Sequence, residues 1–339
     1  MTKYTPIAAS VLLAIASTGA FASNNTAILN QNGTGNMATA DQSDPTVTNN
    51  LITQTQTGDN NEVYAEQTSS NNLGVITQTQ VGDLNFAESF QNDSNVPVAT
   101  ITQIDDGQIA TTVQSFVDTS VATITQSGGS QLATTAQTTS ANDTLVINQS
   151  GDGNVAAGIQ TATSLNSAVI SQTGTNGTAS ATQSGTTSSS MTMIQAGDTN
   201  VVAHQQVLAS NSTTLSFQDG SFNTIFFSQS DDGNYSEGFQ SGTGQTLVHN
   251  QSGGDHWAVT AQVGTSNVAV VTQVGFDNFS SAAQDGTFNN LTVTQPGDFN
   301  TTTASQLGNF NTITVTQSTD LNAAAPAQVG DFNMAIIIQ

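Results

Sequence analysis

The C-terminal third of the chain repeats a glutamine every eleven residues without a slip, and no other feature limits the possible folds as strongly. The run extends from Gln218 to Gln339, and most intervals carry Gly two places and Asn five places after the Gln. A fixed short period is the signature of a repeat architecture, in which each unit contacts only its neighbours. The sequence therefore predicts one elongated array in place of several globular domains.

The glutamine series continues backwards to Gln31 with a slightly longer period. From Gln91 to Gln218 the intervals alternate between twelve and eleven residues, a 23-residue period, and after Gln218 the period is 22. The segments that end on these glutamines number 28, which predicts about 14 rungs of two segments each. Only four or five residues separate most segments, too few for a helix.

The segments themselves have the pattern of strands. Residues 289–295, Asn-Asn-Leu-Thr-Val-Thr-Gln, alternate with period two and are rich in β-branched residues. Glycine in the corners disfavours helix and supplies the positive φ of a tight turn. We therefore expect an all-β fold, a β-solenoid of stacked strand-turn-strand rungs that becomes cross-β on assembly. The expected turn glycines are Gly33, Gly151, Gly197, Gly275, Gly286, Gly297, Gly308 and Gly330.

The alternation also predicts which side chains face inward. In each segment Asn, the third residue, the fifth residue and Gln share one face, and large pairs such as Leu291/Val293 alternate with small pairs such as Thr302/Ala304. Around Gln218 the order of large and small inverts. Stacked on their copies about 4.8 Å away, the inward Asn and Gln would form amide ladders along the axis. The residues expected in these ladders are Gln31, Asn36, Gln42, Gln149, Asn154, Gln160, Gln273, Asn278, Gln284, Asn289, Gln295, Asn300, Gln306, Asn311 and Gln317.

The composition excludes several functions. The chain holds 24 acidic residues, its only basic residue is Lys3, and it has no cysteine. Nucleic-acid binding is excluded because nothing can neutralise phosphates, and thiol chemistry is excluded with cysteine. The three histidines lie in separate repeats without ligand spacing, and no nucleophile motif is present, so we expect neither an enzyme nor a cofactor. Weak Ca²⁺ binding at corner carboxylates such as Asp59 and Asp298 is the one exception we consider.

The N-terminus has the pattern of a secretory signal peptide. Lys3 supplies the positive charge, residues 7–16 form a short apolar run, and Ala20-Phe21-Ala22 forms a cleavage site. The run is too short to span a bilayer, and no other segment is a membrane candidate. We expect residues 1–22 to be removed on secretion, leaving 23–339 as the repeat domain without membrane insertion.

Both ends of this repeat domain are expected to be open sheet edges on which another copy can stack. The first segment begins near Asn25, and Gln339 is itself a repeat glutamine, so we expect no polar capping repeat at either end. Soluble solenoids need such caps, because an open edge recruits further strands. The pattern predicts end-to-end self-assembly.

The motif between Gln31 and Gln42, Gln-x-Gly-x-Gly-Asn-x-Ala-x3-Gln, recurs unchanged between Gln149 and Gln160. It resembles the repeat of curlins, the subunits of curli, the extracellular amyloid fibres of bacterial biofilms. The resemblance implies a fibre subunit that acts in matrix building and surface adhesion. It also implies two kinds of partner, a curli-type nucleator subunit and an outer-membrane secretion channel. Two alternatives stay open: a minor subunit that nucleates or anchors the fibre, and a monomeric calcium- or ice-binding solenoid adhesin.

Overall fold

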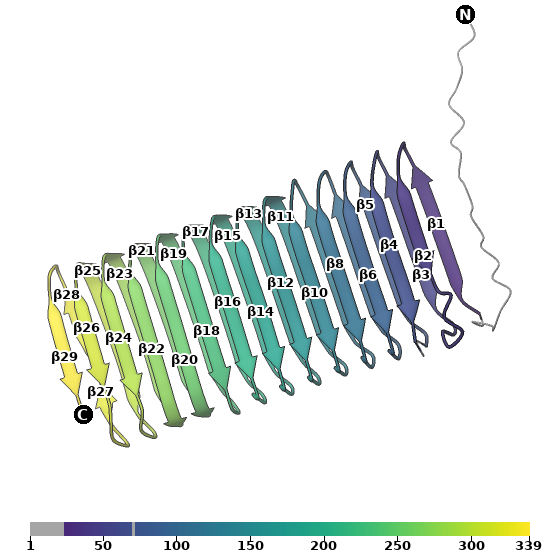
Figure 1. Ribbon diagram of the computed structural model, residues 1–339. Coiled ribbons are helices and arrows are strands. Elements are labelled where there is room, and N and C mark those ends of the chain that lie inside the picture. The colour runs from purple at the N-terminus through teal and green to yellow at the C-terminus, as the bar shows by residue number, and fades with distance from the viewer. Residues whose placement is uncertain (1–23, 70–71) are drawn as a thin grey trace, which may run out of the picture.

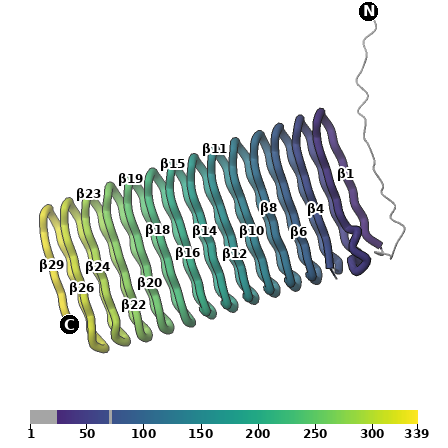
Figure 2. The backbone as a smooth tube through the Cα atoms, in the orientation of Figure 1, coloured from purple at the N-terminus to yellow at the C-terminus, as the bar shows by residue number. Residues whose placement is uncertain are grey.

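The chain folds into one straight rod of two parallel β-sheets, as a computed structural model of residues 24–69 and 72–339 shows (Figure 1). The expected signal peptide, residues 1–22, lies outside the described residues. The chain alternates between the sheets and advances along the axis, which Figure 2 shows as a coil. The predicted β-solenoid of about 14 rungs is confirmed. No helix in the described part of the chain is long and apolar enough to cross a membrane.

One sheet, called here the odd sheet, contains the odd-numbered strands from β1 to β27, together with β28. Its strands are β1 (Thr26–Asn32), β3 (Leu51–Thr57), β5 (Val75–Val81), β7 (Val98–Ile104), β9 (Val121–Ser127), β11 (Thr144–Asp152), β13 (Ser167–Thr175), β15 (Ser190–Asp198), β17 (Thr213–Ser221), β19 (Tyr235–Thr243), β21 (Trp257–Thr265), β23 (Phe279–Thr287), β25 (Thr301–Asn309), β27 (Ala323–Ala324) and β28 (Ala327–Val329). Pro326, which has no N–H, lies between β27 and β28 and divides one repeat segment into two short strands.

The other sheet, the even sheet, contains the remaining strands. These are β2 (Met37–Asp41), β4 (Glu62–Thr68), β6 (Phe86–Asn92), β8 (Ile109–Ser115), β10 (Leu132–Thr138), β12 (Val155–Thr161), β14 (Thr178–Ser184), β16 (Val201–Val207), β18 (Thr224–Ser230), β20 (Thr246–Gly254), β22 (Val268–Phe276), β24 (Asn290–Gln295), β26 (Thr312–Thr316) and β29 (Met334–Ile338). In both sheets neighbouring strands pair at equal repeat positions, as Gln137 pairs with Gln160.

The core lies between the sheets and contains the predicted inward residues. In β24 and its preceding corner Asn289, Leu291, Val293 and Gln295 are buried, while the residues between them point outward. A strand that buries one face must alternate in this way, because successive side chains point to opposite faces. The result is one long apolar cluster from Val63 to Ala324, continuous through nearly the whole rod.

The bulk of the core changes sides near the middle of the rod, as predicted. Before the change the odd sheet supplies the large side chains: a Cβ on Gly158 of the even sheet would lie 2.4 Å from Leu145 Cδ1. After it the even sheet does so, and a Cβ on Gly238 of the odd sheet would lie 2.6 Å from Phe227 Cζ. Each large pair therefore faces a small one, which keeps the core dense.

The corners differ in length. Every corner from odd to even strand is short. The corners from even to odd strand have one extra residue between Gln91 and Ser212, and the two such corners before Gln91 are longer still. In these longer corners isolated β-bridges extend the pairing, ending with Thr187 and Ser210. Side chains such as Val117 and Ala209 point into the core there.

Positive φ angles are not confined to the residues expected. Phe288 and Phe310 adopt φ of 55° and 56°, although bulky residues rarely enter this region. Their rings stack with centroids 5.2 Å apart, and Phe310 stacks in turn on Phe332 at 5.0 Å. Such stacking contributes about 0.5–1.5 kcal/mol per pair, which offsets the strain. Sequence reasoning missed this column because propensity argues against it.

Candidate functional site

Two ladders of glutamine side chains run the length of the described rod. In each, the Nε2 of one Gln donates to the Oε1 of the Gln one rung further on, at 2.7–3.1 Å. The odd-sheet ladder extends from Gln31 to Gln328 and the even-sheet ladder from Gln42 to Gln339. All bonds point the same way, so each ladder has a direction.

The same amides also join the two sheets. Gln273 Nε2 donates to the carbonyl of Trp257 at 3.2 Å, and Gln284 Nε2 donates to that of Val268 at 3.0 Å. In each case the acceptor lies on the preceding strand, in the opposite sheet. One N–H of the amide thus extends the ladder while the other closes the rung. A buried amide left without partners would cost about 1–3 kcal/mol per group.

The predicted asparagines do not form a ladder of amide on amide, and here the prediction was wrong. One such bond is present in the last described rung, where Asn333 Nδ2 donates to Asn311 Oδ1 at 3.1 Å. Asn278 Nδ2 donates to two carbonyls, that of Val274 at 3.0 Å and that of Gly297 in the next rung at 2.6 Å. Its Oδ1 accepts the backbone N–H of Asn300 at 2.9 Å. The short Asn side chain cannot leave the corner, whose carbonyls would otherwise be unsatisfied, so it bonds to backbone.

The other predicted asparagines use the same backbone partners, with one exception. Asn36, Asn154, Asn289 and Asn311 each donate to the corner Gly carbonyl of the next rung. Asn300 keeps only half of this pattern: its Oδ1 accepts the N–H of Asn322 at 3.0 Å, while its Nδ2 has no partner.

His256 takes the place of a corner asparagine. Its Nδ1 accepts the N–H of Asn278 at 3.3 Å, and its Nε2 lies 3.1 Å from the carbonyl of Ser252. It therefore joins the same backbone network and not a metal or catalytic site.

Most predicted turn glycines lie so close to the backbone of the next rung that no side chain fits between them. A Cβ on Gly286, whose φ is 129°, would lie 1.9 Å from the carbonyl oxygen of Gly308. Gly33, Gly151, Gly197 and Gly308 have the same contact with their successors, at 1.8–2.2 Å. Only glycine fits, because both the backbone angle and the space exclude a side chain.

Three of the predicted glycines depart from this arrangement. Gly275 has φ of 102° and lies beside the Asp298 carboxylate, and Gly330, with φ of 100°, has open space around it in the last rung. Gly297 lacks the expected positive φ. Pro296, with its fixed φ, directs the chain along a different path there.

The corner carboxylates bind backbone N–H groups. Asp83 Oδ1 accepts the N–H of Asp59 at 2.6 Å, and Asp298 Oδ1 accepts that of Phe276 at 2.9 Å. The N–H of Thr34 lowers the pKa of Asp59 in the same way. Within the described residues no three His, Cys, Asp or Glu side chains gather into a group that could hold a metal ion. The geometry thus gives these carboxylates a role in joining rungs, which sequence reasoning did not foresee.

Two buried histidines enclose a phenylalanine in the core. Phe227 stacks between His204 and His249, with centroids 4.8 and 4.6 Å away. His204 Nδ1 lies 2.9 Å from Thr214 Oγ1, and His249 Nε2 lies 2.8 Å from Thr260 Oγ1. Burial lowers the pKa of each histidine to about 3. Both imidazoles are therefore neutral core side chains at physiological pH.

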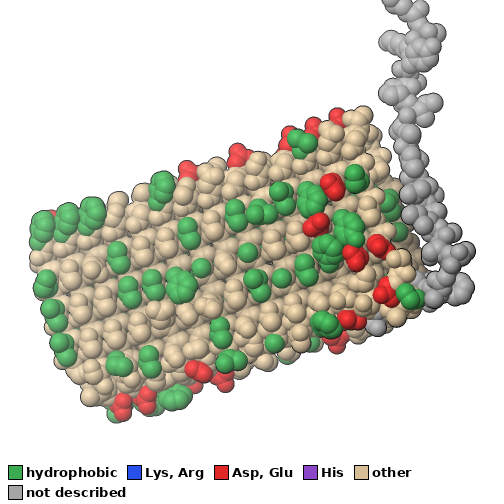
Figure 3. All heavy atoms as spheres, viewed as in Figure 1, with side chains coloured by type: hydrophobic (Ala, Val, Ile, Leu, Met, Phe, Trp, Pro, Cys, Tyr) green, Lys and Arg blue, Asp and Glu red, His purple; other side chains and the backbone are tan. Residues whose placement is uncertain are grey.

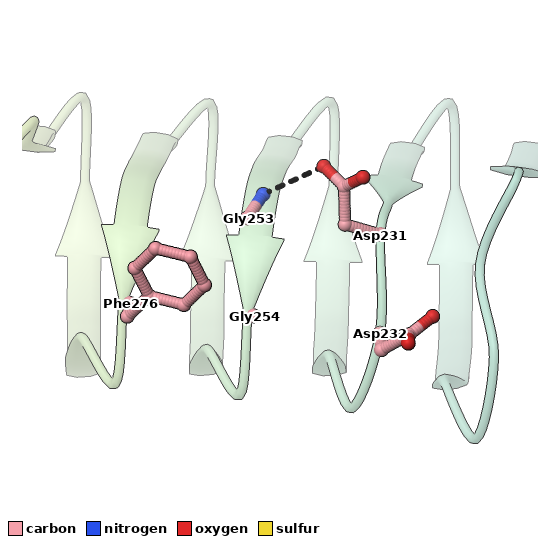
Figure 4. Close-up of a pocket in the computed structure, with 5 residues that line it drawn as sticks. All are labelled: Asp231, Asp232, Gly253, Gly254 and Phe276. Atoms are coloured by element: carbon pink, nitrogen blue, oxygen red, sulfur yellow. Dashed lines mark hydrogen bonds between the residues drawn. The ribbon is translucent and has the colours of Figure 1, made fainter.

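A shallow depression of about 340 Å³ lies at the corners where the corner length changes (Figure 4). Asp231, Asp232, Gly253, Gly254 and Phe276 line it. Asp231 Oδ2 accepts the N–H of Gly253 at 3.1 Å, and Asp232 Oδ1 accepts that of Ser210 at 3.0 Å. Both carboxylates already bond to backbone, and the hydroxyl of Ser230, the last residue of β18, donates to Asp231 Oδ2 at 3.5 Å. The depression therefore has the features of a corner.

The two end rungs of the described rod present complementary edges. Outward-facing residues send their N–H groups to the following rung, as Thr312 does to the Asn333 carbonyl at 2.8 Å. In the last described rung the corresponding N–H groups, such as that of Ile336, point beyond β29. The ladders follow the same rule: among the described residues no amide donates to Gln31 Oε1 or Gln42 Oε1. One end therefore offers donors that the other end can accept.

This architecture defines a parallel β-solenoid with continuous glutamine ladders, a structural scaffold built from one repeat. A family model, the curlin associated repeat, matches residues 286–318, which include β24, β25 and β26. The chain thus carries a curlin repeat in its C-terminal part, in agreement with the resemblance noted in the sequence. No curated protein matches the chain. The family indicated is a structural one and points to no enzyme.

Proposed function

We propose that the protein is a secreted structural subunit that assembles end to end into a curli-like extracellular amyloid fibre. Complementary edges carry this proposal. When the last rung of one copy meets the first rung of another, Gln328 and Gln339 are placed to donate to Gln31 and Gln42. Both ladders would then continue across the joint, as they do between rungs within one copy.

The curlin repeat supports the biological setting. It favours a role in biofilm matrix and surface adhesion, a nucleator subunit as partner, and export through an outer-membrane channel. These partners rest on the repeat and not on a surface of the solenoid. A minor subunit that nucleates or anchors such fibres has the same architecture, and seeding separates the two: a nucleator accelerates other curlin-repeat chains when added in traces.

A monomeric binding solenoid is the second candidate, because one surface favours it. On the odd sheet Thr53, Thr77, Thr100 and Thr123 form an in-register outward column. A second column, two residues along each strand, contains Thr55, Thr79, Thr102 and Thr125. A flat hydroxyl array of this kind could bind an ordered surface such as ice.

Assembly kinetics test the proposal. The chain without residues 1–22, moved from denaturant into buffer at micromolar concentration, should show a lag and then growth of thioflavin T fluorescence. Aligned fibres should give a meridional reflection at about 4.7–4.8 Å. A folded chain that stays monomeric would contradict the proposal and favour the binding solenoid.

A matched pair of variants locates the joint. Ile336→Pro removes an N–H that points away from β26, so it should leave the monomer folded and abolish elongation. Ile336→Thr keeps that N–H and should elongate as the parent does. Equal elongation by the two variants would place the joint elsewhere.

A further inference from the structure

The outer face of the even sheet carries no charge over most of its length. The strands from β8 to β29 contain no Asp, Glu, Lys or Arg, although the whole chain holds 24 acidic residues. The acids of this face gather at its N-terminal end, as Asp41 in β2, Glu62 and Glu66 in β4, and Glu88 in β6. In Figure 3 acidic side chains gather at the N-terminal end of the visible face, and further acids lie along its two edges.

The uncharged stretch, called here the neutral face, also exposes apolar side chains. Ile109, Leu132 and Val155 occupy the same position on successive strands and are 46%, 40% and 39% exposed. Val201 continues this column at 39%. Rows of apolar side chains follow the axis in Figure 3. An uncharged, partly apolar centre with a charged rim is the composition of a protein interface.

The odd sheet has no neutral stretch of this length. Asp219 in β17, Glu237 in β19 and Asp285 in β23 point outward and interrupt its C-terminal half. Asp152 in β11 and Asp198 in β15 add charge further towards the N-terminus, and the outward residues of its strands from β1 to β15 are otherwise mostly threonine and serine. The even sheet therefore provides the longer and more apolar face.

We propose that the neutral face is where a second copy of the chain docks side by side, so that the fibre contains two solenoids in cross-section. This inference rests on the proposed fibre function. The charge of the chain determines where a second copy can bind. Outside residue 3 the chain has no basic residue, so two copies repel each other wherever their acids meet. The neutral face is the one long surface on which they can approach.

The shape and the area of the neutral face fit the docking of a second copy. Eleven strands at about 4.8 Å and seven residues at about 3.3 Å give roughly 50 by 23 Å, or about 1,100 Å² per copy. A stable interface buries about 800 Å² per partner. Two flat sheets pack face to face at about 10 Å. The acids of β2, β4 and β6 set the register, because they must lie against neutral strands of the partner and not against each other.

The mass per unit length of fibres tests the proposal. Thr134→Glu with Ala157→Glu places two carboxylates in the N-terminal part of the neutral face, on the neighbouring strands β10 and β12 at equal positions. The matched control, Thr123→Glu with Val146→Glu, does the same on the odd sheet at the same level of the rod. All four side chains are half-buried and point outward. We expect the neutral-face variant to halve the mass per length of parent fibres and the control to leave it unchanged.

Charge of the opposite sign gives a further test. Thr134→Lys with Ala157→Lys should also give fibres that are one solenoid wide. Fibres of the Glu variant and of the Lys variant, grown separately, should pair when they are mixed.

Parent fibres only one solenoid wide, or equal effects of the variant and its control, would overturn the docking of a second copy on the neutral face. Neither result would contradict the fibre function. If no fibres form, the fibre function fails, and the oligomeric state of the soluble chain is then measured by sedimentation. A parent dimer that only the neutral-face variant dissociates would support the docking of two copies on this face. A monomeric parent would overturn it.

Discussion

The corners from even to odd strand differ between the two halves of the rod. Between Gln91 and Ser212 they hold five residues, and the residue two places after the Gln adopts an ordinary left-handed conformation, as at Phe116 with φ of 55° and Leu208 with φ of 52°. After Ser230 they hold four, and the same position has φ of 111° at Gly253 and 102° at Gly275. With one residue fewer, the backbone at Gly253 and Gly275 lies in a region that only glycine enters readily.

The difference shows that a corner with one more residue can turn the chain without glycine. A five-residue corner turns the chain with side chains that any residue can supply, and it buries one of them, such as Val117. A four-residue corner is tighter and in most cases has glycine two places after the Gln, although Asp231 occupies this position with φ of 68°. The strands themselves are unaffected, because their register is set by pairing and by the glutamine ladders, which pass through both halves. Four tests can break or sharpen this comparison.

The largest effect is expected at a short corner. Gly286→Ala places a Cβ 1.9 Å from the carbonyl oxygen of Gly308 at φ of 129°. Rung contact and backbone strain together should lower the free energy of unfolding by about 4 kcal/mol or more. Gly185→Ala is the control in a long corner, where φ is 63° and the nearest atom is the end of the Leu208 side chain. We expect it to cost about 1–2 kcal/mol, measured as a shift in the denaturant midpoint.

The second effect should be equal in both halves. Gln273→Leu leaves Gln251 Nε2 and Gln295 Oε1 without their ladder partner. Losing these buried bonds should cost about 3–4 kcal/mol. Gln160→Leu removes the corresponding amide from a rung with a long corner and should cost the same. A difference above about 1 kcal/mol between the two denaturation midpoints would show that the corners do alter the ladders.

The third effect lies at the junction of the halves and depends on pH. His204 and His249 have pKa values lowered from 6.5 to about 3 by burial. Below pH 6.5 the unfolded chain binds protons that the folded chain rejects, so stability is full above this pH and falls as pH decreases towards 3. At pH 5.5 the loss should be about 1.4 kcal/mol per histidine, or about 3 kcal/mol together.

Replacing the two histidines isolates this term. His204→Phe with His249→Val should remove most of the loss of stability between pH 7 and pH 5.5, which denaturation at each pH measures. His256→Asn is the control, because His256 is a corner residue that bonds to backbone. If the double variant kept the full pH dependence, the stacked histidines would not be its source.

The smallest effect concerns proline. Pro326 divides β27 from β28, so Pro326→Thr should restore a continuous strand in the last described odd-sheet segment and shorten the lag of fibre growth by a few-fold. Pro97 directly precedes β7, where a missing N–H matters little, and Pro97→Thr should leave the lag unchanged. Slower growth of the Pro326 variant would contradict the idea that this proline restrains assembly.

Sequence periodicity was sufficient for the strands, the rungs and the inward face. Asn289, Leu291, Val293 and Gln295 could be placed because a period of two admits only one buried face. The exchange of large and small pairs followed from the same reasoning, since facing residues must fill one volume.

The corners could not be derived in this way. The bonds of Asn278 to backbone carbonyls depend on the path of the next rung, which no local pattern specifies. The left-handed Phe288 contradicts local propensity, because stacking on its copy one rung away outweighs the backbone preference. Asp298 was recognised as a turn residue, but its bond to the Phe276 N–H joins residues 22 positions apart.

The direction of the hydrogen bonds has a mechanical consequence. Backbone bonds and glutamine bonds both lie along the rod, so a pull on its two ends loads every bond between two rungs at once. A force that lifts one strand end loads the same bonds one after another. Such a rod should resist stretching far better than peeling.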